Sequence, residues 1–418
     1  MRITHINKSD TAGGASVAAV RIVKSLIENG VDAKLLTSEK NTDFSWVKNI
    51  TSSKINNLKS KYYFIFDVMR FLPYEKSKQV RFAYSTGRSG FDISQQPDVL
   101  SADIIHLHWF NQGFLSIKGL EKVLKMGKPV VWTLHDMWSF TGGCHYSGDC
   151  LNYTKNCGFC HFLKNPAKDD ISFSQFNLKN KIYTDTQLFP VTCSNWLAQI
   201  AKQSELLKNR PVTSIPNPID IEIFKPTDKS EARQKLGLPK DKKLILFGAA
   251  NVTDPRKGMN YLFSALNQLI EKSDNNMELV IFGKKSEEIL KNIHLPVHTF
   301  NYISNTETLV NLYNATDVFV LPSMEDNLPN TVMEALACGL PVAAFQIGGV
   351  PEMVSHLENG YLAPSGDSSE LAKGINYLIN NNETNNFRLK ARQKVETNFA
   401  RHIIAKKYKT LYETILNK

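Results

Sequence analysis

The sequence of 418 residues has no apolar run close to the roughly 20 residues that a membrane-spanning helix needs. Its first residues, MRITHI, resemble a strand and lack the apolar core of a secretory signal. With 42% hydrophobic and 22% charged residues, the chain also lacks the bias of a disordered, collagen-like or coiled-coil protein. We therefore expect a globular cytosolic protein of two or three domains.

Several functional motifs are absent as well. We find no zinc-finger, RRM or KH pattern, so nucleic acid is not an expected partner. The first strand is followed by two glycines rather than G-x-G-x-x-G, which argues against a dinucleotide-dependent oxidoreductase. The net charge of +10 comes from residues 1–212, which hold 27 basic and 17 acidic residues, whereas the remainder is neutral. Such a basic half suits anionic lipid or a phosphorylated substrate, or it serves solubility alone.

Four of the six cysteines lie close together in a C-x5-C-x6-C-x2-C pattern: Cys144, Cys150, Cys157 and Cys160. Disulfides are rare in the cytosol, so the pattern leaves open a structural metal, most simply zinc, or reduced thiols without metal, or a redox role. The histidines His145 and His161 are spare candidate ligands.

Strand-like and helix-like segments alternate along the chain, which predicts an α/β fold with parallel sheets. Apolar strands are expected in two series, separated by the proline-rich stretch 212–226. We predict two Rossmann-like domains: residues 1–212, joined by a returning C-terminal helix at 400–418, and residues 213–399.

Residues 55–90 fit this alternation poorly because they interleave aromatic and basic side chains. The residues concerned are Tyr62, Tyr63, Phe64, Phe66, Phe71 and Leu72, with Lys59, Lys61, Arg70, Lys76, Lys78 and Arg81. This pattern predicts either an insert packed on its own domain or a helix that contacts an anionic membrane surface or the acceptor.

The most informative run is LPSMEDNLPNTVMEALACGLPVAAF. It predicts a strand ending near Ser323, an acidic loop, and a helix that starts near Pro329 and carries Glu334. Ligands bind at such strand ends in open α/β sheets, and carboxylates there suit hydroxyl-rich ligands because they accept hydrogen bonds from vicinal diols. The alternative is that Asp326 and Asn327 cap the helix while Glu334 is solvated.

A second candidate is the loop NVTDPRKG after the first strand of the second series. Arg256 and Lys257 stand where a helix begins, which is unfavourable for cations unless an anion binds between them. A diphosphate would supply that anion, and two solvent-exposed charges on a turn are the alternative.

These motifs together resemble the retaining GT-B glycosyltransferases of family 4. The resemblance rests on GGAS, HLHW, VWTLHD, SIPNPID, DPRKG, EDNLPNTVMEALACGLPVA and GGVPE, which span nearly the whole chain. The run WTLHDMWSFTGGCHYSGDC is similar to the exopolysaccharide (colanic-acid-type) branch. The resemblance implies two Rossmann-like domains that face each other across a cleft, an acceptor-side N-terminal domain and a nucleotide-sugar-binding C-terminal domain.

The resemblance also implies roles for residues of the second half. Glu334 would hold the ribose hydroxyls of the nucleotide. Asp326 would contact the donor sugar, with the backbone N–H groups of Asn327 and Leu328 nearby. Lys257 would neutralise the donor diphosphate, assisted by Arg256, because Asn251 stands where the family often has another arginine.

In the first half, the resemblance places Gly13 and Gly14 in the loop that approaches the diphosphate or the acceptor. It places His135 next to the transferred sugar, whereas a buried core histidine is the alternative. His106 and His108 lie two residues apart on one strand, so they share a face, and we interpret them as structural.

The implied activity is retaining transfer of a hexose from a nucleoside-diphosphate sugar to a hydroxyl of a lipid-linked glycan. No DxD-type motif follows a strand, so we expect no catalytic metal. The protein would be cytoplasmic, or peripheral on the inner face of the membrane. The alternatives are a nucleotide-sugar epimerase or phosphorylase of the same fold, and a noncatalytic sugar-binding module.

Overall fold

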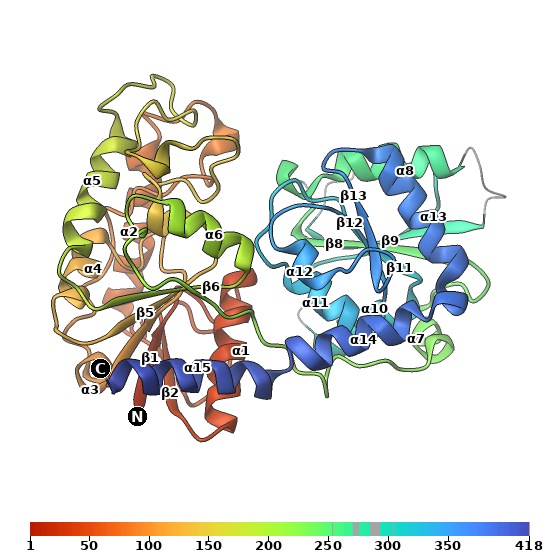
Figure 1. Cartoon of the computed structure of the whole chain (residues 1–418), viewed down its shortest axis with the longest axis horizontal. Coiled ribbons are helices and arrows are strands. Elements are labelled where there is room, and N and C mark those ends of the chain that lie inside the picture. The colour runs from red at the N-terminus through yellow and green to blue at the C-terminus, as the bar shows by residue number, and fades with distance from the viewer. Residues whose placement is uncertain (253, 271–275, 285–292, 304, 418) are drawn as a thin grey trace. The chain divides into compact units, whose positions relative to one another are not determined.

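The computed structural model of the chain describes residues 1–252, 254–270, 276–284, 293–303 and 305–417. It contains two compact units, Met1–Asn217 with Ile404–Lys418, and Pro218–Ile403. Each unit is built on its own sheet, as Figure 1 shows. The divisions fall a few residues later than the boundaries expected from the sequence at 212 and 399.

The first unit contains a sheet of seven strands in the order β3-β2-β1-β4-β5-β6-β7, all parallel. Its strands are β1 (Arg2–Ile6), β2 (Asp32–Thr37), β3 (Val47–Asn49), β4 (Ile104–Leu107), β5 (Val130–Leu134), β6 (Leu188–Thr192) and β7 (Thr213–Ser214). Every residue of β4 and β5 is buried, because helices cover both faces of a parallel sheet.

The helices of this unit follow the strands in the expected alternation. They are α1 (Gly14–Glu28), α2 (Lys54–Phe71), α3 (Pro97–Ser101), α4 (Ile117–Leu124), α5 (Ile171–Tyr183), α6 (Asn195–Gln203) and the last helix, α15 (Arg401–Leu416). In Figure 1, α15 (dark blue) runs alongside the strands of this unit. Its residues Ile404, Tyr408, Tyr412 and Ile415 belong to the core beside β1 and β4, so the predicted return of the C-terminal helix is confirmed.

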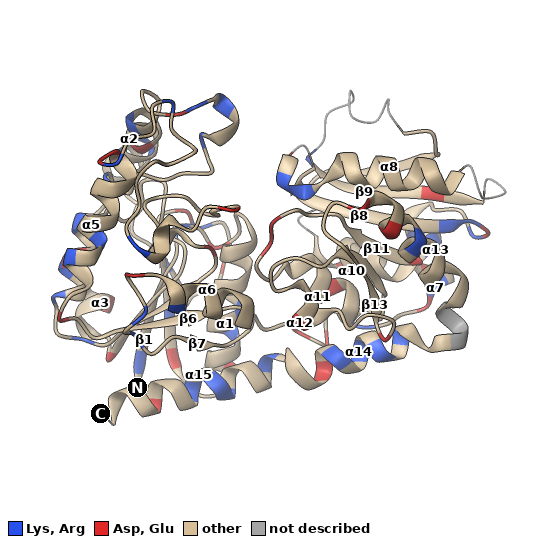
Figure 2. Cartoon of the chain, turned by 45° about the horizontal axis from the view of Figure 1, so that its top comes forward, with Lys and Arg blue, Asp and Glu red and all other residues tan. Residues whose placement is uncertain are grey.

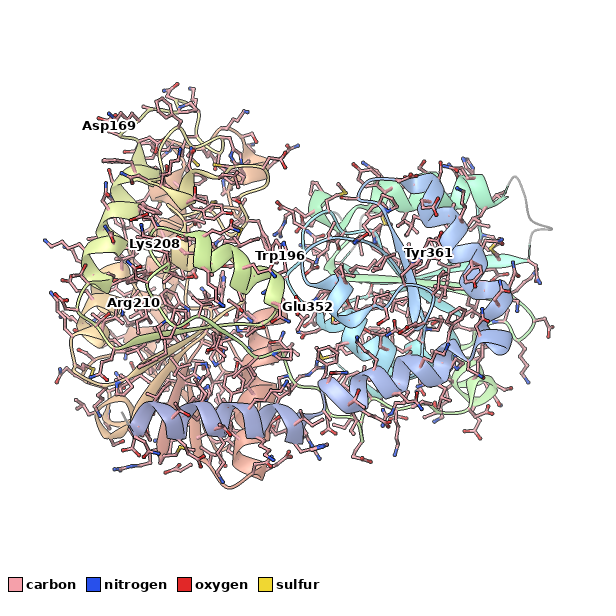
Figure 3. All side chains as sticks on the ribbon, in the orientation of Figure 1. Asp169, Trp196, Lys208, Arg210, Glu352 and Tyr361 are labelled. Atoms are coloured by element: carbon pink, nitrogen blue, oxygen red, sulfur yellow. The ribbon has the colours of Figure 1, made fainter. Side chains whose placement is uncertain are left out.

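The second unit contains six parallel strands in the order β10-β9-β8-β11-β12-β13. They are β8 (Lys243–Asn251), β9 (Met277–Lys284), β10 (Val297–Phe300), β11 (Val318–Leu321), β12 (Val342–Phe345) and β13 (Gly360–Ala363). Its described helices are α7 (Lys229–Leu236), α8 (Met259–Ile270), α10 (Thr306–Ala315), α11 (Asn330–Ala337), α12 (Val350–Met353), α13 (Ser368–Asn385) and α14 (Phe387–Asn398). Helix α13 lies so close to β13 that a Cβ on Gly374 would overlap the ring of Tyr361, which is labelled in Figure 3.

The strand orders identify the places where ligands are expected. In both sheets the order reverses beside the first strand of the unit, between β1 and β4 and between β8 and β11. Loops leave in opposite directions at such a reversal, which opens a crevice at the carboxyl ends of the strands. None of the described helices combines the length and the apolar character that a membrane span requires.

Candidate functional site

Three loops of the second unit meet at the carboxyl ends of β8, β11 and β12. The backbone N–H of Met324, after β11, donates to the carbonyl of Arg256, after β8, at 2.8 Å. The N–H of Gly349, after β12, donates to the carbonyl of Asn327 at 2.8 Å. The sequence motifs DPRKG, EDNLPN and GGVPE are therefore joined by backbone hydrogen bonds at the reversal of the sheet.

Gly258 makes this close approach possible. Its φ of +70° is in the left-handed region, and a Cβ there would overlap the carbonyl oxygen of Pro322. Only glycine adopts this backbone conformation at little cost in free energy and also has no side chain to collide with Pro322. The glycine thus holds Lys257 against the loop that follows β11.

Lys257 and Asp326 form an ion pair, with 2.6 Å between Lys257 Nζ and Asp326 Oδ2. Their side chains are 29% and 13% exposed, so the pair is partly shielded from water but still reachable from solvent. The sequence predicted both residues as ligand contacts. The structure brings them together, and the aspartate holds the lysine in place.

Arg256 forms a different pair. Its guanidinium donates to Asp254 through Nη2 at 2.6 Å and through Nε at 3.2 Å. Burial alone would raise the pKa of Asp254, but the hydrogen bonds and the charge of Arg256 lower it overall. Arg256 is thus neutralised within its own turn, as Lys257 is neutralised by Asp326. Asn251 is the last residue of β8 and is exposed.

Glu334 is nearly buried on α11, with 5% of its surface exposed. Its Oε2 accepts a hydrogen bond from the hydroxyl of Tyr313 on α10 at 2.9 Å. The helix cap is Pro329, and no side chain caps it, so the alternative of a solvated Glu334 below a capping Asp326 or Asn327 is wrong. Tyr313 was not singled out from the sequence, because it is 21 residues away and carries no motif of its own.

The loop between β11 and α11 is itself buried. Asn327 and Leu328 are 3% and 6% exposed. The hydroxyl of Ser323, at the end of β11, is fully buried and has no hydrogen-bond partner among the described residues. An unpartnered hydroxyl costs free energy unless a ligand or water uses it. Ser323 is thus a site candidate that sequence analysis noted only as a strand end.

In the first unit, Gly13 and Gly14 are exposed at the start of α1. Gly13 has φ +83°, and a Cβ there would meet nothing within 4 Å, so the space beside this loop is open. The loop is joined to β4 through Asn7, whose Oδ1 accepts the N–H of Trp109 at 2.9 Å and whose Nδ2 donates to Ser16 of α1 at 3.0 Å.

His135 follows β5 and is partly exposed at the end of a row of imidazoles whose other members, His5, His106 and His108, are buried. Its Nε2 lies 3.2 Å from Nδ1 of His108, and the Nε2 of His108 lies 2.9 Å from Nδ1 of His5. Burial lowers the pKa of His135 to about 4 and that of His5 to about 3. His135 is therefore a neutral imidazole near pH 7, with Nε2 facing His108 and Nδ1 lying 3.5 Å from Cys193 Sγ.

His106 completes this row beside His5, its partner in the pairing of β1 with β4. Its two nitrogens are occupied by the hydroxyls of Tyr412 at 2.6 Å and Thr133 at 2.7 Å. His5, His106 and His108 have ring nitrogens within 4.8 Å of one another, a spacing that a metal could use. All of these nitrogens except His5 Nε2 bond to hydroxyls or to other imidazoles, and His5 Nε2 is buried without a hydrogen-bond partner among the described residues. We interpret the row as a structural network. His5 was missed because strand pairing cannot be read from ITHI.

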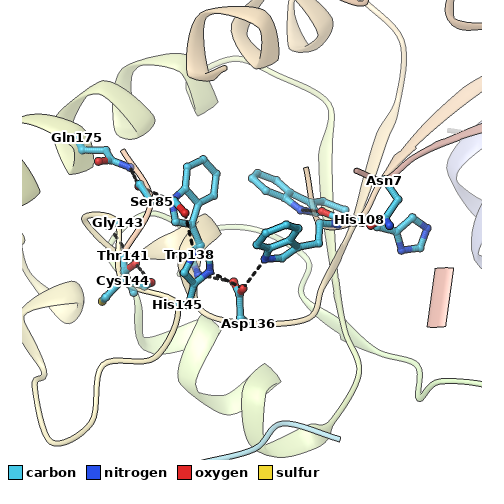
Figure 4. A network of polar contacts seen from close by, with 12 residues as sticks. Asn7, Ser85, His108, Asp136, Trp138, Thr141, Gly143, Cys144, His145 and Gln175 are labelled. Atoms are coloured by element: carbon cyan, nitrogen blue, oxygen red, sulfur yellow. Dashed lines mark hydrogen bonds and ion pairs between the residues drawn. The ribbon is translucent and has the colours of Figure 1, made fainter. Parts of the chain in front are cut away.

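Asp136, next to His135, anchors a second network (Figure 4). Its Oδ2 accepts from Trp109 Nε1 at 2.9 Å and lies 2.6 Å from Nδ1 of His145. The other ring nitrogen of His145 lies 2.8 Å from Ser85 Oγ. Because both nitrogens are engaged, His145 is not a spare metal ligand as the sequence suggested. The network joins the cysteine-containing segment to the strand end that carries His135.

Comparisons with known proteins agree with this architecture. Residues 12–223 match the Glycosyltransferase Family 4 model, and residues 228–395 match Glycosyl transferases group 1. An uncharacterized glycosyltransferase of Haemophilus influenzae is 37% identical over 30% of this chain and 37% of its own length. N-acetyl-alpha-D-glucosaminyl L-malate synthase of Bacillus anthracis is 25% identical over 52% of this chain and 58% of its own length. These matches thus span about four tenths to six tenths of the relatives.

Solved structures are similar over the whole chain. Sucrose-phosphate synthase from Thermosynechococcus elongatus superposes with a TM-score of 0.71 at 18% identity and covers 100% of this chain and 99% of its own. Anabaena HepE in complex with UDP and glucose superposes with a TM-score of 0.66 at 18% identity and covers 99% of both chains.

The two parallel sheets and these likenesses define the class: the chain has the GT-B fold of glycosyltransferases. Since one family model spans more than half of its residues, the chain belongs to glycosyltransferase family 4.

Proposed function

We propose that this protein is a retaining glycosyltransferase that moves a hexose from a nucleoside-diphosphate sugar to a hydroxyl of a lipid-linked glycan in surface polysaccharide synthesis. The observation that carries the proposal is the Lys257–Asp326 pair at the reversal of the second sheet, followed along the same loop and helix by the buried Glu334. Lysine, carboxylates and a buried hydroxyl are the groups needed to bind a diphosphate and sugar hydroxyls at one place.

The reaction would proceed without a metal or an enzyme nucleophile. The bond between the anomeric carbon and the diphosphate oxygen breaks, and negative charge develops on the diphosphate. Lys257 and the positive end of the α11 dipole would stabilise that charge. The acceptor hydroxyl forms the new bond on the same face and gives its proton to a departing phosphate oxygen.

Uridine is the first base to test, because Anabaena HepE, whose fold is similar, was solved with UDP and with UDP-glucose. The rival functions make different predictions. An epimerase or phosphorylase would act on a sugar without a glycan acceptor. A noncatalytic module would bind sugar equally well with or without nucleotide. Acceptor-dependent release of UDP would support the transferase over both.

Glu334→Gln is expected to weaken UDP binding about 10- to 100-fold, the effect of removing a charged hydrogen-bond acceptor from a buried site. Isothermal titration calorimetry with UDP measures this directly. Glutamine keeps the size of the side chain and can still accept from Tyr313, so the fold should be retained. The matched control is Glu307→Gln on the exposed surface of α10, where 75% of the side chain is exposed.

The control protein should bind UDP like the wild type. Equal UDP affinity of Glu334→Gln and wild type would contradict the assignment of α11 to nucleotide binding. If neither the wild type nor the control binds UDP but both bind another nucleoside diphosphate, the choice of uridine is wrong. The assignment of the nucleotide site would then still hold.

We also propose that α2 places the protein on an anionic membrane surface. Six large apolar residues on or next to α2 are exposed, at spacings of three and four: Ile55, Leu58, Tyr62, Ile65, Met69 and Leu72. These spacings put them on one face of the helix. On the opposite face, Asp67 and Phe71 are buried, so the expected aromatic insert does pack on its own unit through that face.

Basic residues, blue in Figure 2, flank the apolar stripe of α2. Lys59, Lys61 and Arg70 are exposed, and by helical spacing they fall on either side of the stripe. An apolar face edged by cations is the arrangement that binds in the interface of an anionic bilayer. This placement would bring the enzyme to a lipid-linked acceptor.

Replacing Leu58 and Ile65 together by serine is expected to reduce binding to vesicles of mixed zwitterionic and anionic phospholipid at least 10-fold. Two exposed apolar side chains contribute roughly 1.5–3 kcal/mol each when they leave water. Vesicle co-sedimentation measures the effect, and Leu389→Ser, an exposed leucine of the second unit, is the control. Unchanged binding of the double variant, or equal binding to purely zwitterionic vesicles, would contradict the proposal.

A further inference from the structure

The segment 141–170, between β5 and α5, contains little regular structure. Its one short helical element among the described residues is the 3₁₀ turn Asn152–Thr154. A loop of this length without strands or helices usually needs a functional reason or a staple to hold its shape. It carries four of the six cysteines of the chain, none of which forms a disulfide.

The four cysteine side chains converge on one cavity. Cys144, Cys150, Cys157 and Cys160 all line it, and its volume is about 20 Å³. Cys144, Cys157 and Cys160 are buried, and Cys150 is partly exposed. Their convergence could not be read from the spacing of the cysteines in the sequence, because only Cys157 and Cys160 are close neighbours.

Backbone N–H groups are directed at these sulfur atoms. The N–H of Gly142 donates to Cys157 Sγ at 3.1 Å, and the N–H of Phe162 donates to the sulfur of Cys160. Gly158 lies between Cys157 and Cys160 in the sequence. Its backbone is so close to Lys168 that a Cβ on Gly158 would lie 2.5 Å from the carbonyl oxygen of Lys168. Hydrogen bonds of this kind support thiolates that bind a metal.

A buried cation lies beside the cysteines. Lys179 of α5 is fully buried, donates to the carbonyl of Thr141 at 3.1 Å and also to that of Trp138. Burial lowers the pKa of Lys179 to about 7, and the nearby Cys157, Cys144 and Asp136 oppose that shift. Four thiolates around a metal carry net negative charge, which Lys179 would offset, since a buried charge needs a partner.

We propose that Cys144, Cys150, Cys157 and Cys160 hold a metal centre through their four sulfur atoms. The site is independent of the sugar-transfer site and needs no knowledge of the substrate. Its position has a structural consequence, because Cys144 precedes His145, which bonds to Asp136 beside His135. The metal centre would cross-link the segment 141–170 and so fix the position of the hydrogen-bond network around Asp136 (Figure 4).

The spacing of the sulfur atoms favours an iron–sulfur cluster over a single zinc ion. Zinc with four bonds of about 2.3 Å needs sulfurs only about 3.8 Å apart. Among the described residues, no three of these sulfurs lie within 4.8 Å of one another. A cluster places iron atoms and sulfides between the cysteines, so its ligands are farther apart. A zinc ion would instead require the four side chains to close in.

The test is metal and sulfide analysis of the full-length protein purified without oxygen and without added metal. We expect about four iron atoms and about four acid-labile sulfides per chain, with visible absorption that bleaches on reduction. About one zinc per chain without sulfide would support the four-cysteine centre but overturn the cluster. If the contents of both iron and zinc lie below about a tenth of the chain concentration, the proposal is overturned.

Cys150→Ser provides the second measurement, because Cys150 is partly exposed and its replacement disturbs the core least. It is expected to lower the metal content at least several-fold and to lower the melting temperature. The control is Cys338→Ser, a buried cysteine of the second unit at the end of α11, which should keep the full metal content. Equal metal in Cys150→Ser and in the control would contradict ligation by Cys150.

Discussion

Lys257→Ala is expected to lower kcat/KM for sugar transfer about 100- to 1,000-fold, the usual effect of removing one charge that stabilises the transition state. The departing diphosphate gains negative charge as the bond to the sugar breaks. Lys257, held 2.6 Å from Asp326, is already placed at the strand ends where that charge would develop. Steady-state kinetics with saturating acceptor, measuring release of UDP, tests the prediction.

Loss of the ion pair itself should cost little stability. A partly exposed pair contributes roughly 1 kcal/mol or less, so the melting temperature should change by a few degrees at most. Lys257→Arg should restore part of the activity, because it keeps the charge but not the shape. The matched control is Lys373→Ala, an exposed lysine on α13. A large loss of stability in Lys257→Ala with unchanged kcat/KM would show that Lys257 is a structural residue. It would contradict the proposed role of Lys257 in stabilising the departing diphosphate.

The protein is expected to unfold in mildly acidic solution, near pH 5, because of its buried histidines. Burial lowers the pKa of His5 to about 3 and of His135 to about 4, and it lowers the pKa of His106 and His108 strongly. In the unfolded chain these groups bind protons near pH 6.5. Unfolding therefore takes up protons below pH 6.5, so the free energy of unfolding falls as the pH drops from 6.5 toward 4.

The free energy of unfolding is expected to depend steeply on pH. Each histidine contributes up to about 1.4 kcal/mol per pH unit, so four contribute roughly 5 kcal/mol per unit, comparable to the whole stability of many domains. Urea unfolding at pH 7.5, 6.5, 5.5 and 5.0 measures the slope. His5→Asn should reduce the number of protons taken up on unfolding by about one, and so reduce the slope. Replacement of the exposed His402 by asparagine should leave the slope unchanged. A free energy of unfolding that is flat between pH 7 and 5 would contradict the prediction.

Much of the second unit could be predicted from its sequence. The strands β11 and β12 and the helix α11 form where continuous apolar runs and a proline predicted them. The edge strands β3, β7, β10 and β13 were not predicted. They are short, and β10 is only partly buried, so their sequences lack the apolar pattern that burial on both faces imposes.

The candidate site was predicted only in part. Lys257 and Asp326 were singled out, but as contacts of the ligand and not of each other, since they are 69 residues apart. The bond between Tyr313 and Glu334 and the buried hydroxyl of Ser323 have no signal in the sequence. Such contacts depend on how strands pair and helices pack, which one sequence does not reveal.

The amino-acid sequence by itself determined the two α/β units and the place of the donor motifs at strand ends, because these follow from local apolar periodicity and short motifs. Only the tertiary structure decided which distant residues meet. The order of the strands brings His5 beside His106, α15 brings Tyr412 to His106 across 306 residues, and the fold of segment 141–170 directs four cysteines into one cavity. The physical reason is that pairing and burial are properties of the whole chain, whereas helix and strand preferences are properties of its segments.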